Sequence, residues 1–131
     1  RELGGRVTRE ARLPGLADRA PRRMLLSRDA GAAPDGWLRV ASPAEAVQAD
    51  GVLDLLVEGG AETAAAFLAA GLVDRLLLYR APVVIGGGLR AVGNLDLGDL
   101  AMAHGRWRLA GRGTLGTDTL EVYDRTRCLP A

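Results

Sequence analysis

The sequence predicts an α/β domain with a mostly parallel sheet, flanking helices and a C-terminal antiparallel hairpin. Short apolar runs alternate with helical segments between residues 22 and 79, and such alternation is typical of parallel strands joined by helical crossovers. Two further strand-like runs, 106–112 and 119–125, are separated by a short segment with two glycines, which indicates a hairpin. The chain has 131 residues, 48% of them hydrophobic, and its length suits one domain.

The first 21 residues are expected to hold little regular structure. Residues 1–21 are rich in arginine, glycine and proline, and we interpret them as an irregular lead-in to a domain that covers residues 22–131. Short strands are predicted over 22–28 and 37–41, on either side of a loop.

The middle of the chain carries clear start and stop signals. A helix is predicted over 42–50, because Ser42 can cap it, Pro43 suits the first helical position and Glu45 lies three residues after the cap. Residues 52–58 follow as a strand. That run is apolar except for Asp54, which is typical of a strand covered on both faces.

A second helix is predicted over 61–70, with Phe67 and Leu68 as its apolar anchors and Gly71 just past its end. Residues 72–86 are expected to start with a turn and to continue as a strand through Tyr79, and Pro82 indicates an interruption or an edge position. A long glycine-rich loop over 86–99 and a short helical turn at 100–104 precede the hairpin.

Charge and composition exclude several classes of function. The net charge is +1 with the two signs interspersed, so no basic surface for nucleic acid or an anionic membrane is indicated. All 17 basic residues are arginine, which excludes chemistry that needs a lysine. His104 and Cys128 are the only residues of their kinds, so a metal site built on them and an intramolecular disulfide are both excluded. No secretory signal or membrane span is present, and we expect a cytoplasmic protein.

Two glycine clusters are candidates for ligand contact. Residues 111–116 spell G-x-G-x-x-G, but a strand-like segment follows instead of a helix, so we interpret them as part of the hairpin and its turn. Residues 86–88 are three consecutive glycines after a strand. They could approach a ligand closely or form a flexible loop, and the sequence does not separate these two readings.

The junction Glu58-Gly59-Gly60 is the strongest candidate site. A strand is predicted to lead directly into a helix there, and a helix start offers unpaired N–H groups and the positive end of the helix dipole. A phosphate fits such a place, and glycines let it approach the backbone. Glu58 itself has two readings: a carboxylate that accepts nearby backbone N–H groups, or an acceptor for donor groups of a substrate.

No catalytic constellation is visible in the sequence, and we assign no catalytic residue and no metal ligand. This absence is compatible with hydride transfer, in which a nicotinamide supplies the chemistry and the protein binds and orients.

The run from residue 55 to 88 resembles the reductase domain of the bifunctional riboflavin-biosynthesis deaminase–reductase. The matching motifs are Val57-Glu58-Gly59-Gly60, Gly71-Leu72-Val73-Asp74, Ala81-Pro82 and Gly86-Gly87. A weaker resemblance covers Arg6 to Pro14, with Thr8 where the family usually has aspartate, and the terminal Leu-Glu-Val-Tyr-Asp-Arg.

The resemblance implies a dihydrofolate-reductase-like fold. It also implies NADPH-dependent reduction of the ribosyl side chain of 5-amino-6-(5-phosphoribosylamino)uracil to ribityl, by hydride transfer. By the family pattern Glu58 contacts this phosphorylated aminouracil. The residues expected to cradle the cofactor phosphates are Gly60, Ala61, Glu62, Thr63, Ala64, Ala65 and Ala66. A homo-oligomer is expected, with a deaminase domain in the parent chain.

Two departures from the family lead us to expect a partial domain. The family's reductase domain begins well before Arg1, and the zinc signature of the deaminase, H-x-E followed by P-C-x-x-C, does not occur in these residues. Two alternatives stay open: a reductase of the same superfamily with another pterin-like substrate, and a non-catalytic nucleotide-binding or assembly fragment. Turnover of the aminouracil phosphate and the mass of the natural protein would separate them.

Overall fold

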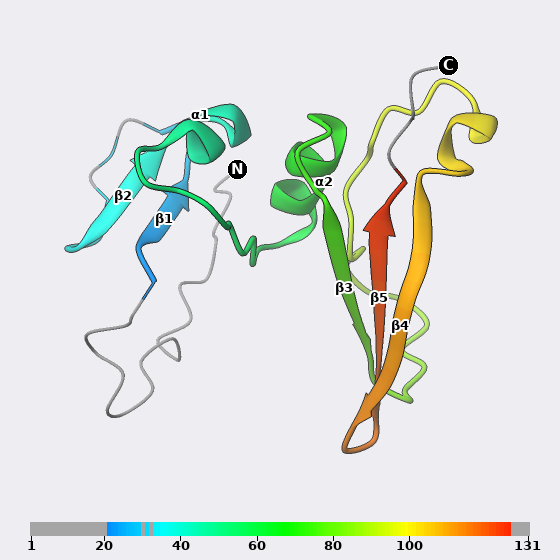
Figure 1. Ribbon diagram of the computed structural model, residues 1–131. Coiled ribbons are helices and arrows are strands. Elements are labelled where there is room, and N and C mark those ends of the chain that lie inside the picture. Colours follow the sequence, from blue (N-terminus) through cyan, green and yellow to red (C-terminus); the bar gives the residue numbers. More distant parts are fainter. Residues whose placement is uncertain (1–20, 30, 32, 127–131) are drawn as a thin grey trace. The chain divides into compact units, whose positions relative to one another are not determined.

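The computed structural model describes residues 21–29, 31 and 33–126 (Figure 1). The chain divides into two compact units, Arg1–Leu72 with Ala91–Asn94, and Val73–Arg90 with Leu95–Ala131. The predicted lead-in over 1–21, apart from Pro21, lies outside the described residues, as do Arg6 to Pro14 and Cys128.

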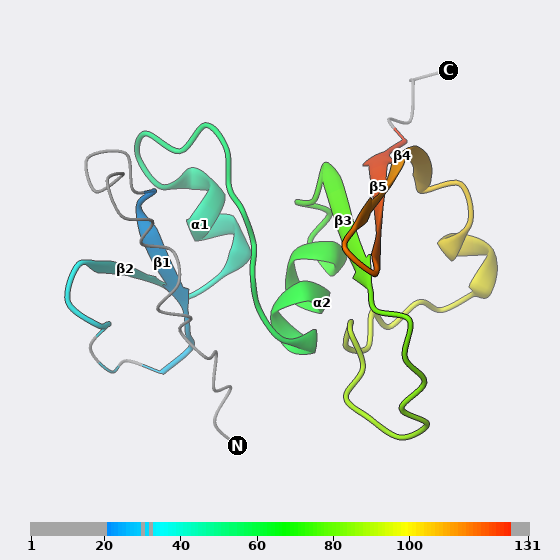
Figure 2. The same cartoon turned by 90° about the horizontal axis from the view of Figure 1, so that it is seen from below.

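The first unit contains two parallel strands and a helix that packs against them. β1 (Arg23–Leu26) pairs in parallel with β2 (Trp37–Val40), which confirms both predicted short strands. α1 (Pro43–Gln48) contacts both strands, as Figures 1 and 2 show. Val40 of β2 and Ala46 of α1 are both buried, each with 2% of its surface exposed.

The start of α1 follows the predicted capping pattern. Ser42 has extended backbone angles, and its Oγ accepts a hydrogen bond of 3.1 Å from the Glu45 backbone N–H. Glu45 returns the interaction, because its Oε2 accepts a bond of 2.6 Å from the Ala41 N–H. The two residues therefore satisfy two backbone donors at this helix start reciprocally.

The prediction of a strand over residues 52–58 is wrong for this structure. These residues have no regular secondary structure, and Leu53 and Leu56 are 95% and 72% exposed. A strand exists only through hydrogen bonds to a neighbouring strand, and the described residues provide none for this segment. An apolar sequence alone therefore does not suffice to form it.

α2 (Ala61–Ala69) matches the predicted second helix closely. Its alanine-rich sequence has high helix propensity, and Phe67 buries all but 4% of its surface. The helix ends as expected at Gly71, whose φ of 67° lies in the left-handed region. The Leu72 N–H donates to the Phe67 carbonyl and the Gly71 N–H to the Leu68 carbonyl, both at 3.1 Å, which is the Schellman pattern.

The second unit contains a three-stranded antiparallel sheet in the order β3-β5-β4. Its strands are β3 (Arg75–Arg80), β4 (Trp107–Leu115) and β5 (Asp118–Arg125). β4 and β5 confirm the predicted C-terminal hairpin. Its turn is shorter than predicted: Gly111 and Gly113 belong to β4, and Gly116, with φ of 60°, opens a two-residue turn of the type that glycine favours in hairpins.

The mostly parallel sheet is not confirmed. Among the described strands only β1 and β2 pair in parallel, and β3 pairs with β5 in antiparallel register. The expectation of parallel pairing depended on residues 52–58 forming a strand, which they do not do here.

The short helical turn before the hairpin is present as η3 (Leu100–Ala103), capped by the Asp99 carboxylate.

Candidate functional site

The start of α2 is open. Gly60 is the N-cap residue, and no side chain among the described residues caps this helix end. The Gly60 carbonyl accepts the first helical bond, from the Ala64 N–H at 3.1 Å. The N–H groups that precede Ala64 in the first turn have no intrahelical acceptor, because none exists at any helix start. They are donors available to an external anion.

The two glycines of the junction differ in their surroundings. A Cβ at Gly59 would lie 2.8 Å from the Thr63 Cβ, so this glycine is required for the contact with Thr63. A Cβ at Gly60 would meet nothing within 4 Å. Space for a ligand is therefore at Gly60, directly before the open N–H groups, while Thr63 fills the space at Gly59.

Glu58 is exposed, and it follows residues 52–57, which are apolar except for Asp54. Within the described part of the chain, the structure gives Glu58 no hydrogen bond or ion pair, so it does not accept the nearby backbone N–H groups as the first reading had it. Its carboxylate is two residues before the N-cap of α2. It is therefore available for a polar group of a ligand near that helix start.

The predicted cradle residues fall into two groups along α2. Glu62 is exposed in the first turn, and Gly60 and Thr63 lie at the open helix start. Ala65 is 5% exposed, with Ala64 and Ala66 half-buried beside it. The first group meets solvent where the free N–H groups are, and the second contributes to the packing of the helix.

A glycine that the sequence analysis did not single out fixes the other side of this turn. The Gly93 N–H donates a bond of 2.9 Å to the Ala61 carbonyl. A Cβ at Gly93 would lie 3.0 Å from the Glu62 Oε1 and 3.2 Å from the Ala65 Cβ. Gly93 therefore allows the backbone of residues 91–94 to lie directly on α2. The sequence shows only one glycine among many in a loop, so it gives no signal for this contact.

The other glycine cluster, at residues 86–88, lies in an exposed loop. Gly86, Gly87 and Gly88 are fully in a loop of exposed residues, and at Gly86 and Gly87 a Cβ would meet nothing within 4 Å. Both interpretations of this loop, close approach to a ligand and a flexible loop, stay predictions.

His104, the only histidine, is exposed at the end of η3. No group of His, Cys, Asp and Glu in the described residues could hold a metal ion.

A cluster of charged and hydroxyl groups lies in the other unit, on the β3-β5-β4 sheet. Glu121 is 5% exposed, and its Oε1 accepts a bond of 2.7 Å from Arg112 while its Oε2 accepts one of 3.0 Å from the Tyr123 hydroxyl. The hydrogen bond from Arg112, together with that from Tyr123, lowers the pKa of Glu121. The same bond to Glu121 raises the pKa of Tyr123. Sequence reasoning missed this cluster, because it depends on the register of three strands.

The family defined by the RibD C-terminal domain matches residues 40–120, which include Glu58, both glycines of the junction and α2. The chain belongs to the RibD C-terminal domain family. The resemblance to a riboflavin-biosynthesis reductase domain is therefore confirmed.

Individual members of this family are similar to parts of the chain. Riboflavin biosynthesis proteins RibD of two Mycobacterium tuberculosis strains, CDC 1551 / Oshkosh and ATCC 25618 / H37Rv, are 39% identical to it over 67 residues. A solved structure of Acinetobacter baumannii RibD (form 2) superposes with a TM-score of 0.57 and 28% identity over 70% of this chain. The chain has an α/β fold similar to that structure.

The matches cover a small share of these relatives. The aligned part of the chain spans 20% of the length of the Mycobacterium proteins and 27% of the Acinetobacter chain.

No helix in the described residues is long and apolar enough to cross a membrane.

Proposed function

We propose that this RibD C-terminal domain acts in an NADPH-dependent reductase of riboflavin biosynthesis. The reaction is reduction of the ribosyl side chain of 5-amino-6-(5-phosphoribosylamino)uracil to ribityl. The observation that carries the proposal is the family match over residues 40–120, which includes a helix start that is uncapped and open at Gly60. Bound NADPH would supply the hydride, and the residues of this chain would bind and orient.

The start of α2 fits the phosphates of a dinucleotide. The free N–H groups of the first turn donate, the helix dipole adds an attraction of about 0.3–1 kcal/mol when exposed, and Gly60 leaves room for close approach. In this proposal the cradle runs from Gly60 to Ala66, with Gly60 to Thr63 at the phosphates and Ala64 to Ala66 holding the helix in place. The Glu62 carboxylate lies beside Gly93, and in this proposal it is directed away from the anion.

Glu58 is proposed to accept hydrogen bonds from donor groups of the aminouracil substrate. Its exposure and its lack of a partner in the described residues support this role. A carboxylate that accepts from a substrate N–H or O–H makes a charge-assisted bond, which is stronger than a neutral one. The residue therefore orients the substrate while α2 holds the cofactor.

The fold and its setting belong to the same proposal. Residues 22–131 are proposed to be the C-terminal portion of a dihydrofolate-reductase-like domain in a longer, cytoplasmic, homo-oligomeric protein that also carries a deaminase domain. Residues 52–58, apolar except for Asp54 and Glu58 and without a strand partner among the described residues, support this, because an earlier part of such a protein would provide the strands with which they pair.

The decisive experiment compares turnover and cofactor binding in the full-length protein. Glu58→Gln is expected to lower kcat/KM for the aminouracil phosphate by about 10-fold or more while leaving the Kd for NADPH unchanged, because a bond to a charged group contributes about 1.5–3 kcal/mol. An equal loss of both, or of neither, would contradict the substrate role. Absence of any turnover by the wild-type protein would favour the non-catalytic alternative.

A further inference from the structure

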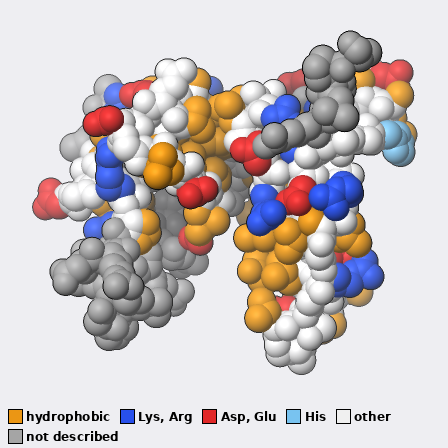
Figure 3. All heavy atoms as spheres, in the orientation of Figure 1, with side chains coloured by type: hydrophobic (Ala, Val, Ile, Leu, Met, Phe, Trp, Pro, Cys, Tyr) orange, Lys and Arg blue, Asp and Glu red, His pale blue; other side chains and the backbone are white. Residues whose placement is uncertain are grey.

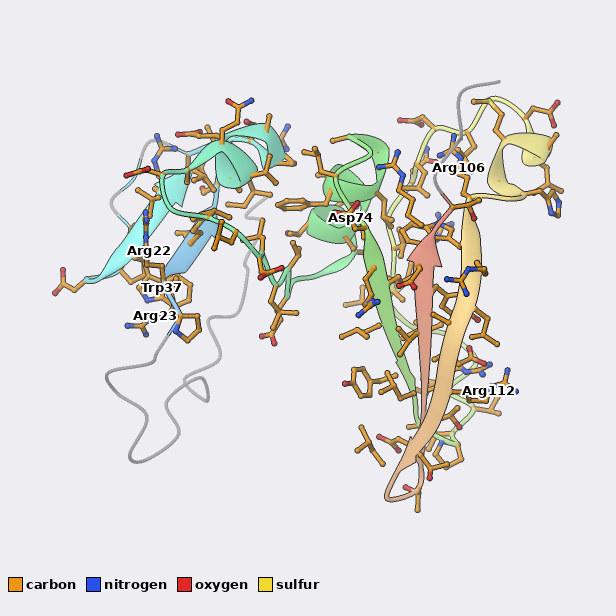
Figure 4. All side chains as sticks on the ribbon, in the orientation of Figure 1. Arg22, Arg23, Trp37, Asp74, Arg106 and Arg112 are labelled. Atoms are coloured by element: carbon orange, nitrogen blue, oxygen red, sulfur yellow. The ribbon has the colours of Figure 1, made fainter. Side chains whose placement is uncertain are left out.

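A buried carboxylate between two exposed guanidinium groups is the most unusual polar cluster in the described residues. Glu121 lies on the central strand β5, and 6% of its side chain is exposed. Arg112 of β4 reaches its Oε1 at 2.7 Å and Arg80 of β3 reaches the same oxygen at 3.2 Å. The two arginine side chains are 63% and 62% exposed. Figure 4 labels Arg112, which projects from β4.

The strand register adds two hydroxyl groups beside this cluster. Thr119 of β5 pairs with Arg80 of β3 on one side and with Thr114 of β4 on the other. Thr119 lies two residues before Glu121, and Thr114 lies two residues after Arg112, the β4 partner of Glu121. Residues two apart on a strand point to the same face. Thr119 and Thr114 therefore share the face of Glu121, Arg112 and Arg80.

The cluster has an excess of positive charge and of donors. Two guanidinium groups surround one carboxylate, which leaves a charge of +1. Both oxygens of Glu121 are already engaged, one by the arginines and the other by the Tyr123 hydroxyl. Each guanidinium carries five N–H donors, and the contact with Glu121 accounts for only a part of them. Glu121 therefore holds two arginines side by side with donors directed to solvent.

We propose that this face of the β3-β5-β4 sheet is a binding site for a phosphate group, held by Arg80 and Arg112 with hydroxyl contacts from Thr119 and Thr114. The planar guanidinium matches a phosphate through paired N–H donors, and the threonine hydroxyls donate to its remaining oxygens. The ligand is free phosphate or a small phosphate monoester. The proposal goes beyond the proposed reductase function, and its residues belong to a different unit from Glu58 and α2.

The opposite face of the same sheet provides an internal control. Asp124 lies between Arg75 at 2.8 Å and Arg108 at 3.4 Å, so this triad has the same formal charge. Its neighbours two residues along are Leu77, Val122 and Gly111, which offer no hydroxyl. If charge alone bound phosphate, both triads would bind it equally.

The test is a titration of the full chain with inorganic phosphate, followed by ³¹P NMR and thermal unfolding at constant ionic strength with chloride as the reference. Saturable binding with a rise in Tm is expected. Arg80→Gln should weaken the phosphate Kd about 10- to 100-fold, the usual effect of losing a charged hydrogen bond. Glu121 keeps Arg112 and Tyr123 in this variant, so folding should be preserved, which circular dichroism checks.

Two further variants keep the proposal testable if Arg80→Gln is unstable. Thr119→Val keeps every contact of Glu121 and should weaken the phosphate Kd about 2- to 10-fold. Arg75→Gln, the matched control, should leave it unchanged. No saturable binding, or an equal loss in Arg75→Gln and Arg80→Gln, would overturn the proposal. A parallel titration with ribose 5-phosphate identifies the source: tighter binding than inorganic phosphate indicates a monoester, and equal or weaker binding indicates free phosphate.

Discussion

Replacement of Gly60 by aspartate separates the stability of α2 from its proposed ligand binding. Gly60 is the N-cap, its φ of −74° and ψ of −179° suit any residue, and a Cβ there meets nothing within 4 Å. Aspartate is a preferred N-cap residue and its charge complements the helix dipole. Gly60→Asp is therefore expected to raise the stability of the protein by about 0.5–1 kcal/mol, or about 2–5 °C in Tm.

The same substitution is expected to weaken NADPH binding. It places a negative charge where the cofactor phosphate is proposed to lie. Two like charges about 4 Å apart repel by about 1 kcal/mol in water and about 4 kcal/mol near a protein surface, so the Kd should rise roughly 5-fold to several hundred-fold. Fluorescence titration of the full-length protein with NADPH measures this, and a thermal scan of the same samples measures the stability.

Gly60→Asn is the matched control, since it has nearly the same shape and also caps the helix but carries no charge. It should gain stability and lose much less affinity than the aspartate variant. If Gly60→Asp bound NADPH with the Kd of the wild type, the start of α2 would not be the phosphate site. If both variants lost affinity equally, the effect would be steric and the argument from charge would be wrong.

Three further predictions concern stability. Ser42→Ala removes the cap of α1 and should cost about 1 kcal/mol in urea unfolding; no change would show that the 3.1 Å bond contributes nothing. Gly93→Ala should cost about 1–3 kcal/mol through its contacts at 3.0–3.2 Å with α2, whereas Gly98→Ala, with nothing within 4 Å, should not destabilise; equal effects would contradict the packing argument. Because the pKa of Glu121 is lowered in the folded state, its stabilisation is present above its unfolded value of about 4.3 and is lost as pH falls through the folded value. Glu121→Gln should therefore lower Tm at pH 7 and flatten the decline of Tm below about pH 4, and a decline as steep as that of the wild type would exclude this role.

The sequence was most informative where structure depends on local contacts. The C-terminal end of α2 and the start of α1 follow from residues within a single turn: Ser42 and Glu45 form reciprocal bonds, and Gly71 adopts the left-handed conformation that a Schellman end requires. The hairpin also follows from nearby residues, because Gly116 allows β4 and β5 to reverse in two residues.

Features that depend on distant partners could not be predicted in the same way. Residues 52–58 have the composition of a buried strand, yet a strand needs hydrogen bonds from another segment, and composition does not show whether that segment is there. The Glu121 cluster needs the register of three strands, including the bulge between Leu109 and Gly111 that shifts β4 against β5. The candidate site was located by its glycines, but the roles of Thr63 over Gly59 and of Gly93 on α2 became visible only in three dimensions.

The exposed, unpaired segment over residues 53–57 is expected to affect how this chain behaves in solution. Leu53, Leu56 and Val57 present their side chains to water, and Figure 3 shows further apolar side chains on the molecular surface. A segment whose backbone N–H and C=O groups are not paired with a strand can form strand pairs with another chain, including a second copy of this one. Preparations of the 131-residue chain should therefore scatter light increasingly with concentration, and charged substitutions at Leu53 and Leu56 should keep them clear.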